Sequence, residues 1–138
     1  MTDPDLLAKK LALVETCVQE LRTLGRPEAI EGDLREQRFV EHTLQIAIQA
    51  ALDAASHVVS DKRLGEPRTN RELFELLERA GMVGVDLAAR LRDMAGFRNV
   101  LVHGYDTVDL RIVRDVVENR LDDLLAYVEA LRSRIEGA

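Results

Sequence analysis

Residues 40–59 read VEHTLQIAIQAALDAASHVV, and this stretch decides the fold. Its apolar residues recur at intervals of three and four, which is the period of one face of an α-helix. The alanines between positions 47 and 55 are small enough to let a neighbouring helix approach closely. The stretch therefore predicts a long helix packed against another helix through one apolar face: Val40, Leu44, Ala47, Ile48, Ala51, Ala55, Val58 and Val59.

Helix start and stop signals divide the rest of the chain into further helices. Small polar residues that precede an apolar stripe are typical N-caps, and a Glu three residues later completes a capping box. The predicted starts are Asp3 followed by Pro4, Asp33 with Glu36, Thr69 with Glu72, and Asp109. Glycine, often with a nearby proline, marks the predicted ends: Gly25 with Pro27, Gly65 with Pro67, Gly81, and Gly104 as a C′ terminator.

Helical stripes of apolar residues continue on both sides of the long helix, and no stretch alternates with the two-residue period of a strand. Short connections favour antiparallel neighbours. We therefore predict one all-α domain over residues 1–138, an up-and-down bundle of four long helices and one short helix. The stripes are Leu7, Leu11, Val14, Val18 and Leu21; Leu87, Leu91, Met94 and Arg98 on a helix over residues 85–103; and Val113, Val117, Leu121, Leu124, Val128, Leu131 and Ile135 on a single last helix.

Composition narrows the function. The net charge is −6, divided as −4, 0 and −2 over residues 1–60, 61–120 and 121–138, which does not indicate broad affinity for nucleic acid. An aromatic share of 4% argues against a base-stacking platform. The single cysteine, Cys17, lies among apolar residues and is expected to be buried and unreactive. No signal peptide or membrane span is evident, so a cytoplasmic protein is expected. No metal or other cofactor is expected.

The residues that suggest chemistry lie together in the run from Phe97 to Tyr105, which ends the fourth helix. Arg98 offers a permanent planar cation that suits phosphate oxygens, and His103 offers an imidazole whose unperturbed pKa lies near neutrality. This pairing suits cleavage of an RNA phosphodiester without a metal. His103 would transfer a proton, and Arg98 would stabilise the charge that grows on the phosphate.

The spacing of the two residues sets a geometric condition. Positions 98 and 103 lie about 140° apart around an ideal helix. They converge only if the last turn unwinds near Gly104, or if a second copy of the chain brings its own motif opposite. A cation near a helix C-terminus is also common for purely structural reasons. The place of Arg98 on an apolar stripe favours a functional reading, because a guanidinium on a packing face needs a partner.

The stretch from Gly96 to Asp109, GFRNVLVHGYDTVD, resembles the signature of the HepT-like branch of HEPN domains. That signature is an arginine followed by a polar residue, then four residues on a histidine, one spacer and a tyrosine. Arg98, Asn99, His103 and Tyr105 fit it, and the resemblance extends from about residue 33 to residue 131 through the order of the helices.

The resemblance implies an all-helical homodimer in which paired motifs line a cleft, and a metal-independent endoribonuclease. It also implies a toxin whose antitoxin is a minimal nucleotidyltransferase. In that family the antitoxin can transfer AMP to the motif tyrosine, which corresponds to Tyr105. Arg98 and His103 are then the catalytic residues, with Asn99 in a supporting role. The alternative is a non-catalytic HEPN dimer that binds a nucleotidyltransferase or a nucleotide.

Other polar groups receive structural interpretations. His42 and His57 are fifteen residues apart, too far to share a metal, and Asp53 with His57 predicts a surface hydrogen bond between positions i and i+4. Phe74 and Tyr127 are expected in the core. A basic group around Pro67 is either a solvated rim or a guide for RNA: Lys62, Arg63, Arg68 and Arg71.

Overall fold

The computed structural model describes residues 3–103 and 108–136, with the backbone alone for His103, Ile135 and Glu136. Over these residues the chain is all-helical, as predicted, and contains no strand. None of the described helices is both long enough and apolar enough to cross a membrane. The elements are α1 (Pro4–Leu24), a short 3₁₀ helix η1 (Pro27–Ala29), α2 (Leu34–Asp61), α3 (Asn70–Arg79), α4 (Val85–His103), α5 (Leu110–Asn119) and α6 (Leu121–Glu136).

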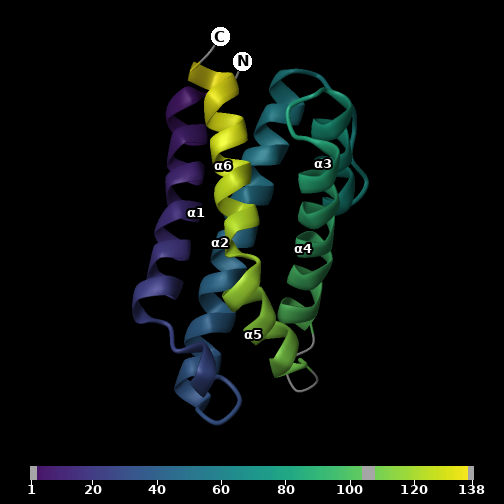
Figure 1. Cartoon of the computed structure of the whole chain (residues 1–138). Coiled ribbons are helices and arrows are strands. Elements are labelled where there is room, and N and C mark those ends of the chain that lie inside the picture. Colours follow the sequence, from purple (N-terminus) through teal and green to yellow (C-terminus); the bar gives the residue numbers. More distant parts are fainter. Residues whose placement is uncertain (1–2, 104–107, 137–138) are drawn as a thin grey trace.

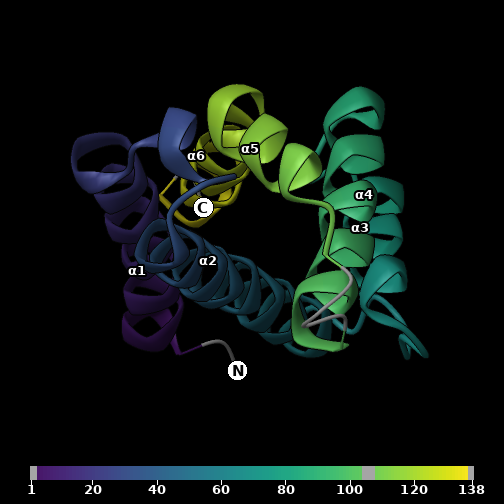
Figure 2. The ribbon, with the colours of Figure 1, turned by 90° about the horizontal axis from the view of Figure 1, so that it is seen from below.

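The helices pack as an antiparallel bundle around α2 (Figure 1). Helix α2 contacts α1, α3, α4 and α5, while α6 closes the bundle against α1 and α4. Seen from below, α2 runs between α1 on one side and the pair α3 and α4 on the other (Figure 2). The two ends of the chain lie at one end of the bundle, and the carboxyl end of α4 lies at the opposite end (Figure 1).

The core confirms the apolar face predicted for α2, because all eight of its residues are buried. The Tyr127 side chain of α6 reaches α2, where its hydroxyl donates to the carbonyl oxygen of Ala51 at 2.8 Å. The ring of Tyr127 meets that of Phe74 edge to face, with centroids 5.6 Å apart. Both rings are core residues, as predicted, and burial raises the pKa of Tyr127 far above its usual value.

All four predicted N-caps are present. The Asp3 carboxylate accepts from the backbone N–H groups of Asp5 and Leu6, and Pro4 occupies the first helical position. The other three caps each accept one backbone N–H two or three residues ahead. They are Asp33 with Arg35 at 2.9 Å, Thr69 with Glu72 at 3.2 Å, and Asp109 with Arg111 at 2.9 Å.

The predicted capping boxes are only half formed, because the two Glu side chains do not bond to the backbone of their N-cap residues. The carboxylate of Glu36 accepts from the backbone N–H of Arg26 at 2.7 Å, and that of Glu72 accepts from the backbone N–H of Arg68 at 2.6 Å. Neither carboxylate turns back to the N-cap residue of its own helix. Each therefore ties the incoming loop to the first turn of the helix.

The prediction of a single last helix is also wrong, because the helix is interrupted at Arg120 and forms α5 and α6. The backbone N–H of Arg120 still bonds to the carbonyl oxygen of Val116 at 2.9 Å, so the break comes at the end of a complete turn. The break lets α5 pack against η1 and α2 while α6 runs along α1. An unbroken helix has one axis and cannot follow both directions.

Candidate functional site

Helix α4 carries Arg98 at the edge of the core. Leu91 and Met94, which precede it on the same stripe, are buried, and Arg98 itself is half-buried. Its Nε atom is shielded from solvent and has no hydrogen-bond partner among the described residues. A buried N–H on a cation costs free energy unless an acceptor satisfies it, so this guanidinium can bind an acceptor that the described residues do not supply.

A pocket of about 290 Å³ opens beside Arg98. It lies along one face of α2, between α1 and α4. The residues of α2 that line it recur at intervals of three and four, so they form a single helical face. The described residues around the pocket are Lys10 and Leu13 of α1; His42, Gln45, Ile46, Gln49, Ala50 and Asp53 of α2; and Arg98 of α4.

The polar side chains of this pocket are held by specific contacts. Lys10 Nζ lies 3.0 Å from Asp53 Oδ2, and Gln49 Nε2 donates to Asp53 Oδ1 at 2.8 Å. Gln45 Nε2 donates to the backbone carbonyl of Leu101 at 3.4 Å, a weak contact that connects α2 to the last turn of α4. His42 is exposed at the rim. The pocket thus has a paired charge at Asp53 and a cation at Arg98.

The remaining motif residues are placed only in part. Asn99 is exposed on α4. Helix α4 continues to His103, so positions 98 and 103 face directions about 140° apart within one chain. The side chain of His103 and the whole of Gly104 and Tyr105 lie outside the described residues. The roles of Asn99, His103 and Tyr105 therefore stay predictions.

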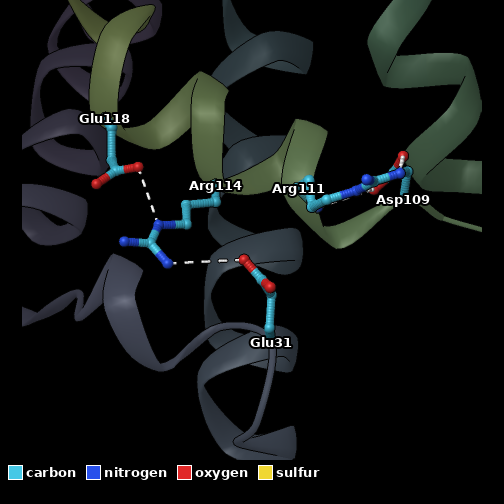
Figure 3. Close-up of polar contacts among 5 residues, drawn as sticks. All are labelled: Glu31, Asp109, Arg111, Arg114 and Glu118. Carbon is cyan, nitrogen blue, oxygen red and sulfur yellow. Dashed lines mark hydrogen bonds and ion pairs between the residues drawn. The ribbon is translucent and has the colours of Figure 1, made fainter.

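The chain that follows the motif is anchored by charged contacts on α5 (Figure 3). Arg111 donates through Nε and Nη2 to the Asp109 carboxylate, each at 3.2 Å, and these bonds lower the pKa of Asp109 and raise that of Arg111. Arg114 Nε donates to Glu118 at 3.0 Å, and its Nη1 lies 3.6 Å from Glu31. Glu31 belongs to the loop before α2, so this pair joins the middle of α5 to that loop.

Other polar candidates from the sequence have different surroundings. The predicted Asp53–His57 hydrogen bond is wrong, because Asp53 binds Lys10 and Gln49 while His57 Nε2 accepts from the backbone N–H of Asp3 at 3.0 Å. Cys17 is buried as predicted, and burial raises the pKa of its thiol. Among the described residues, no group of three His, Cys, Asp or Glu side chains could hold a metal ion.

The basic residues around Pro67 are exposed, which fits both predictions for them. Arg71 differs from the others because it reaches α4: a Cβ atom added at Gly96 would lie 3.2 Å from its Nη1 atom. Sequence analysis missed Gln45 and Gln49 as site residues. With His42 they form a polar row at intervals of three and four, which would have been a usable signal once α2 was known to face Arg98.

Comparison with known proteins shows the family of the chain. The sequence matches the family described as "Ribonuclease HepT-like" over residues 14–131. It is 28% identical over 130 residues to the mRNA nuclease HepT of Shewanella oneidensis, covering 94% of this chain and 98% of the relative. It is 27% identical over 133 residues to the tRNA nuclease HepT of Aphanizomenon flos-aquae, covering 95% of this chain and 90% of the relative.

A solved structure agrees with these sequence relatives. The fold superposes with a TM-score of 0.86 on the tri-AMPylated Shewanella oneidensis HEPN toxin in complex with MNT antitoxin, at 28% identity, covering 96% of this chain and 99% of the other. The match to the family spans most of the bundle, from α1 to α6. The chain belongs to the HepT-like ribonuclease family, and its bundle is a HEPN fold.

Proposed function

We propose that this protein is an endoribonuclease toxin of a HEPN and nucleotidyltransferase toxin–antitoxin pair. It cuts RNA without a metal ion, in a cleft between two copies of the chain. The observation that carries this proposal is Arg98 of the motif helix, a half-buried cation that borders a pocket and whose Nε atom has no partner among the described residues. Membership of a ribonuclease family and relatives named as RNA nucleases support the same conclusion.

The proposed chemistry uses the 2′-hydroxyl of RNA as the nucleophile. Arg98 binds the phosphate and offsets the negative charge that develops in the transition state. His103 accepts the hydroxyl proton or gives a proton to the leaving oxygen, and Asn99 supports the phosphate or the imidazole. Attack on phosphorus breaks the bond to the 5′-oxygen and leaves a cyclic phosphate.

Two copies of the chain satisfy the geometric condition set by α4. Because α4 is helical as far as His103, Arg98 of one protomer would meet His103 of its partner rather than its own. Exposed apolar side chains near the pocket offer a surface for this pairing. Leu6 and Leu13, seven residues apart on one face of α1, are 42% and 38% exposed.

An antitoxin would act at the same place. The Shewanella oneidensis relative is tri-AMPylated and is bound to an MNT antitoxin, and this chain carries Tyr105 two positions after His103. We propose that a minimal nucleotidyltransferase transfers AMP to the Tyr105 hydroxyl, with pyrophosphate leaving from ATP. Each added phosphate places negative charge beside Arg98 and repels the RNA backbone.

The test is cleavage of RNA by the purified protein in the presence of a chelator. Arg98→Ala and His103→Ala are each expected to lower the cleavage rate by at least about a hundredfold, because each removes a group that acts in the transition state. Arg134→Ala is the matched control, since Arg134 lies near the end of α6, at the opposite end of the bundle from the end of α4 (Figure 1).

Expression in cells separates the nuclease from the non-catalytic dimer. A nuclease predicts that expression without a partner slows growth and that His103→Ala removes the effect. Equal cleavage by all variants in chelator, or harmless expression together with no cleavage by the unmodified chain, contradicts the proposal.

A further inference from the structure

The pocket beside Arg98 is lined by two glutamines whose amide oxygens are free to accept hydrogen bonds. The Asp53 carboxylate can only accept, so Gln49 must turn its Nε2 toward it, and the Gln49 Oε1 atom is directed elsewhere. Gln45 likewise uses its Nε2 atom on the carbonyl of Leu101. No described residue donates to either amide oxygen. A ligand that enters the pocket can therefore donate N–H hydrogen bonds to these oxygens.

The charges of the pocket give a bound nucleotide one orientation. Arg98 is the cation without a partner among the described residues, so it attracts a phosphate. The other basic residue, Lys10, is neutralised by Asp53 at 3.0 Å. This ion pair has no net charge, which leaves its end of the pocket, next to Gln49, for an uncharged group.

The size and walls of the pocket suit a flat, partly apolar group. Its volume of about 290 Å³ lies near the lower limit of pockets that hold small molecules. Ile46 and Ala50 supply apolar surface, and the exposed imidazole of His42 at the rim offers a flat ring on which a base can stack. A single nucleobase has apolar faces and a polar edge, so it matches these walls and the amides.

We propose that this pocket is a base-binding subsite for one nucleotide next to the cut phosphate, and that Gln49, with Gln45, selects a base that carries an exocyclic amino group. The proposal rests on the proposed ribonuclease function and deepens it. The amide oxygens accept from the amino group of cytosine or adenine, and they oppose the carbonyl oxygen that uracil presents at the position of the cytosine amino group.

The experiment compares oligoribonucleotides that are identical except for a cytosine-to-uracil exchange at one position near the mapped cut. The exchange replaces an amino donor by a carbonyl acceptor with almost no change in size. The expected result is about a tenfold lower kcat/KM for the uracil substrate, in the range of one hydrogen-bonded base contact. Gln49→Met, which keeps the length of the side chain and removes its amide, is expected to abolish this difference.

Gln19→Met is the matched control, because Gln19 is exposed on α1 and does not line the pocket. This control is expected to keep the preference for cytosine. Loss of the preference in both variants, its retention in Gln49→Met, or equal cleavage of the cytosine and uracil series at every position overturns the subsite.

A binding measurement keeps this test separate from the proposed nuclease activity. The same fluorescent oligonucleotides are titrated with His103→Ala protein, alone and combined with Gln49→Met, and anisotropy reports their affinity. Suppose that the unmodified chain cuts no RNA, but His103→Ala protein binds the cytosine series about tenfold more tightly than the uracil series, and Gln49→Met removes this difference. That result supports the subsite and contradicts the nuclease. A chain that cuts RNA with no discrimination in cleavage or binding does the reverse.

Discussion

At the scale of single residues, the presence of a hydrogen-bond partner distinguishes structural buried polar atoms from candidate functional ones. Tyr127 is fully buried but its hydroxyl has an acceptor in Ala51, so it is satisfied within the fold. Arg98 Nε is shielded from solvent and has no acceptor among the described residues. Since an unsatisfied buried donor costs free energy, its presence at the edge of a pocket is evidence of a site that a ligand completes.

The pair Glu15 and Arg132 provides a test of stability against pH. Arg132 donates to both carboxylate oxygens, at 2.7 and 3.0 Å, and these bonds hold the pKa of Glu15 below its usual value. A folded pKa below the unfolded one stabilises the protein above the unfolded pKa, and this contribution is lost as the pH falls through the folded value. Both side chains are partly exposed, so Glu15→Gln is expected to lower the free energy of unfolding at neutral pH by only about 0.5 kcal/mol.

Urea denaturation at several pH values measures this effect. The difference between Glu15→Gln and the unmodified chain should shrink below about pH 4. Glu20→Gln on the same helix is the control, because no described residue forms an ion pair with this exposed carboxylate, and a smaller difference is expected there. A Glu15→Gln deficit that stays constant into acid would show that the ion pair is not its source.

At the scale of elements, the ends of helices are set by local chemistry. The N-caps act on backbone N–H groups two or three residues away, so they need no distant partner. Gly81 ends α3 with φ of +73°, a left-handed conformation that strains residues with a Cβ atom. A Cβ atom added there would meet no atom within 4 Å, so the cost of substitution comes from the backbone alone.

We therefore expect Gly81→Ala to lower the free energy of unfolding by about 1 kcal/mol. Gly32→Ala is the matched control, because Gly32 also has nothing within 4 Å and has no positive φ. It is expected to be neutral or slightly stabilising, since alanine restricts the unfolded chain. Chemical denaturation of both variants checks this, and equal losses would contradict the conformational explanation.

At the scale of the whole molecule, the bundle brings α1, α2 and α4 together around one pocket. Leu13 contributes apolar surface beside Arg98 and is 38% exposed. In the proposed dimer it is covered by the partner. Substitution by glutamate places a charge in that interface in both protomers, because a two-fold contact repeats every change.

Leu13→Glu is expected to weaken self-association by at least about tenfold and to lower cleavage with it, because a buried charge without a partner is costly. Sedimentation velocity measures the first effect and RNA cleavage the second. Ile112→Glu is the control, since Ile112 is exposed on α5 and lies outside this pocket. A Leu13→Glu monomer that cuts RNA normally would contradict a site shared by two copies.

The sequence by itself determined the helical class, the buried stripes, the N-caps and the motif that carries the family resemblance. Each of these depends on residues within about one or two turns of one another, so local spacing is sufficient to predict it. This is why the buried face of α2 and the caps of α1, α2, α3 and α5 are confirmed residue by residue.

Only the tertiary structure decided the break at Arg120, the partner that Glu36 finds in the loop before its helix, and the pocket that joins Gln49 to Arg98. These features depend on which elements lie opposite one another in space. A carboxylate takes the nearest unsatisfied N–H, and a helix ends where its neighbours change direction. Spacing along one helix cannot specify either condition, because the deciding atoms belong to other parts of the chain.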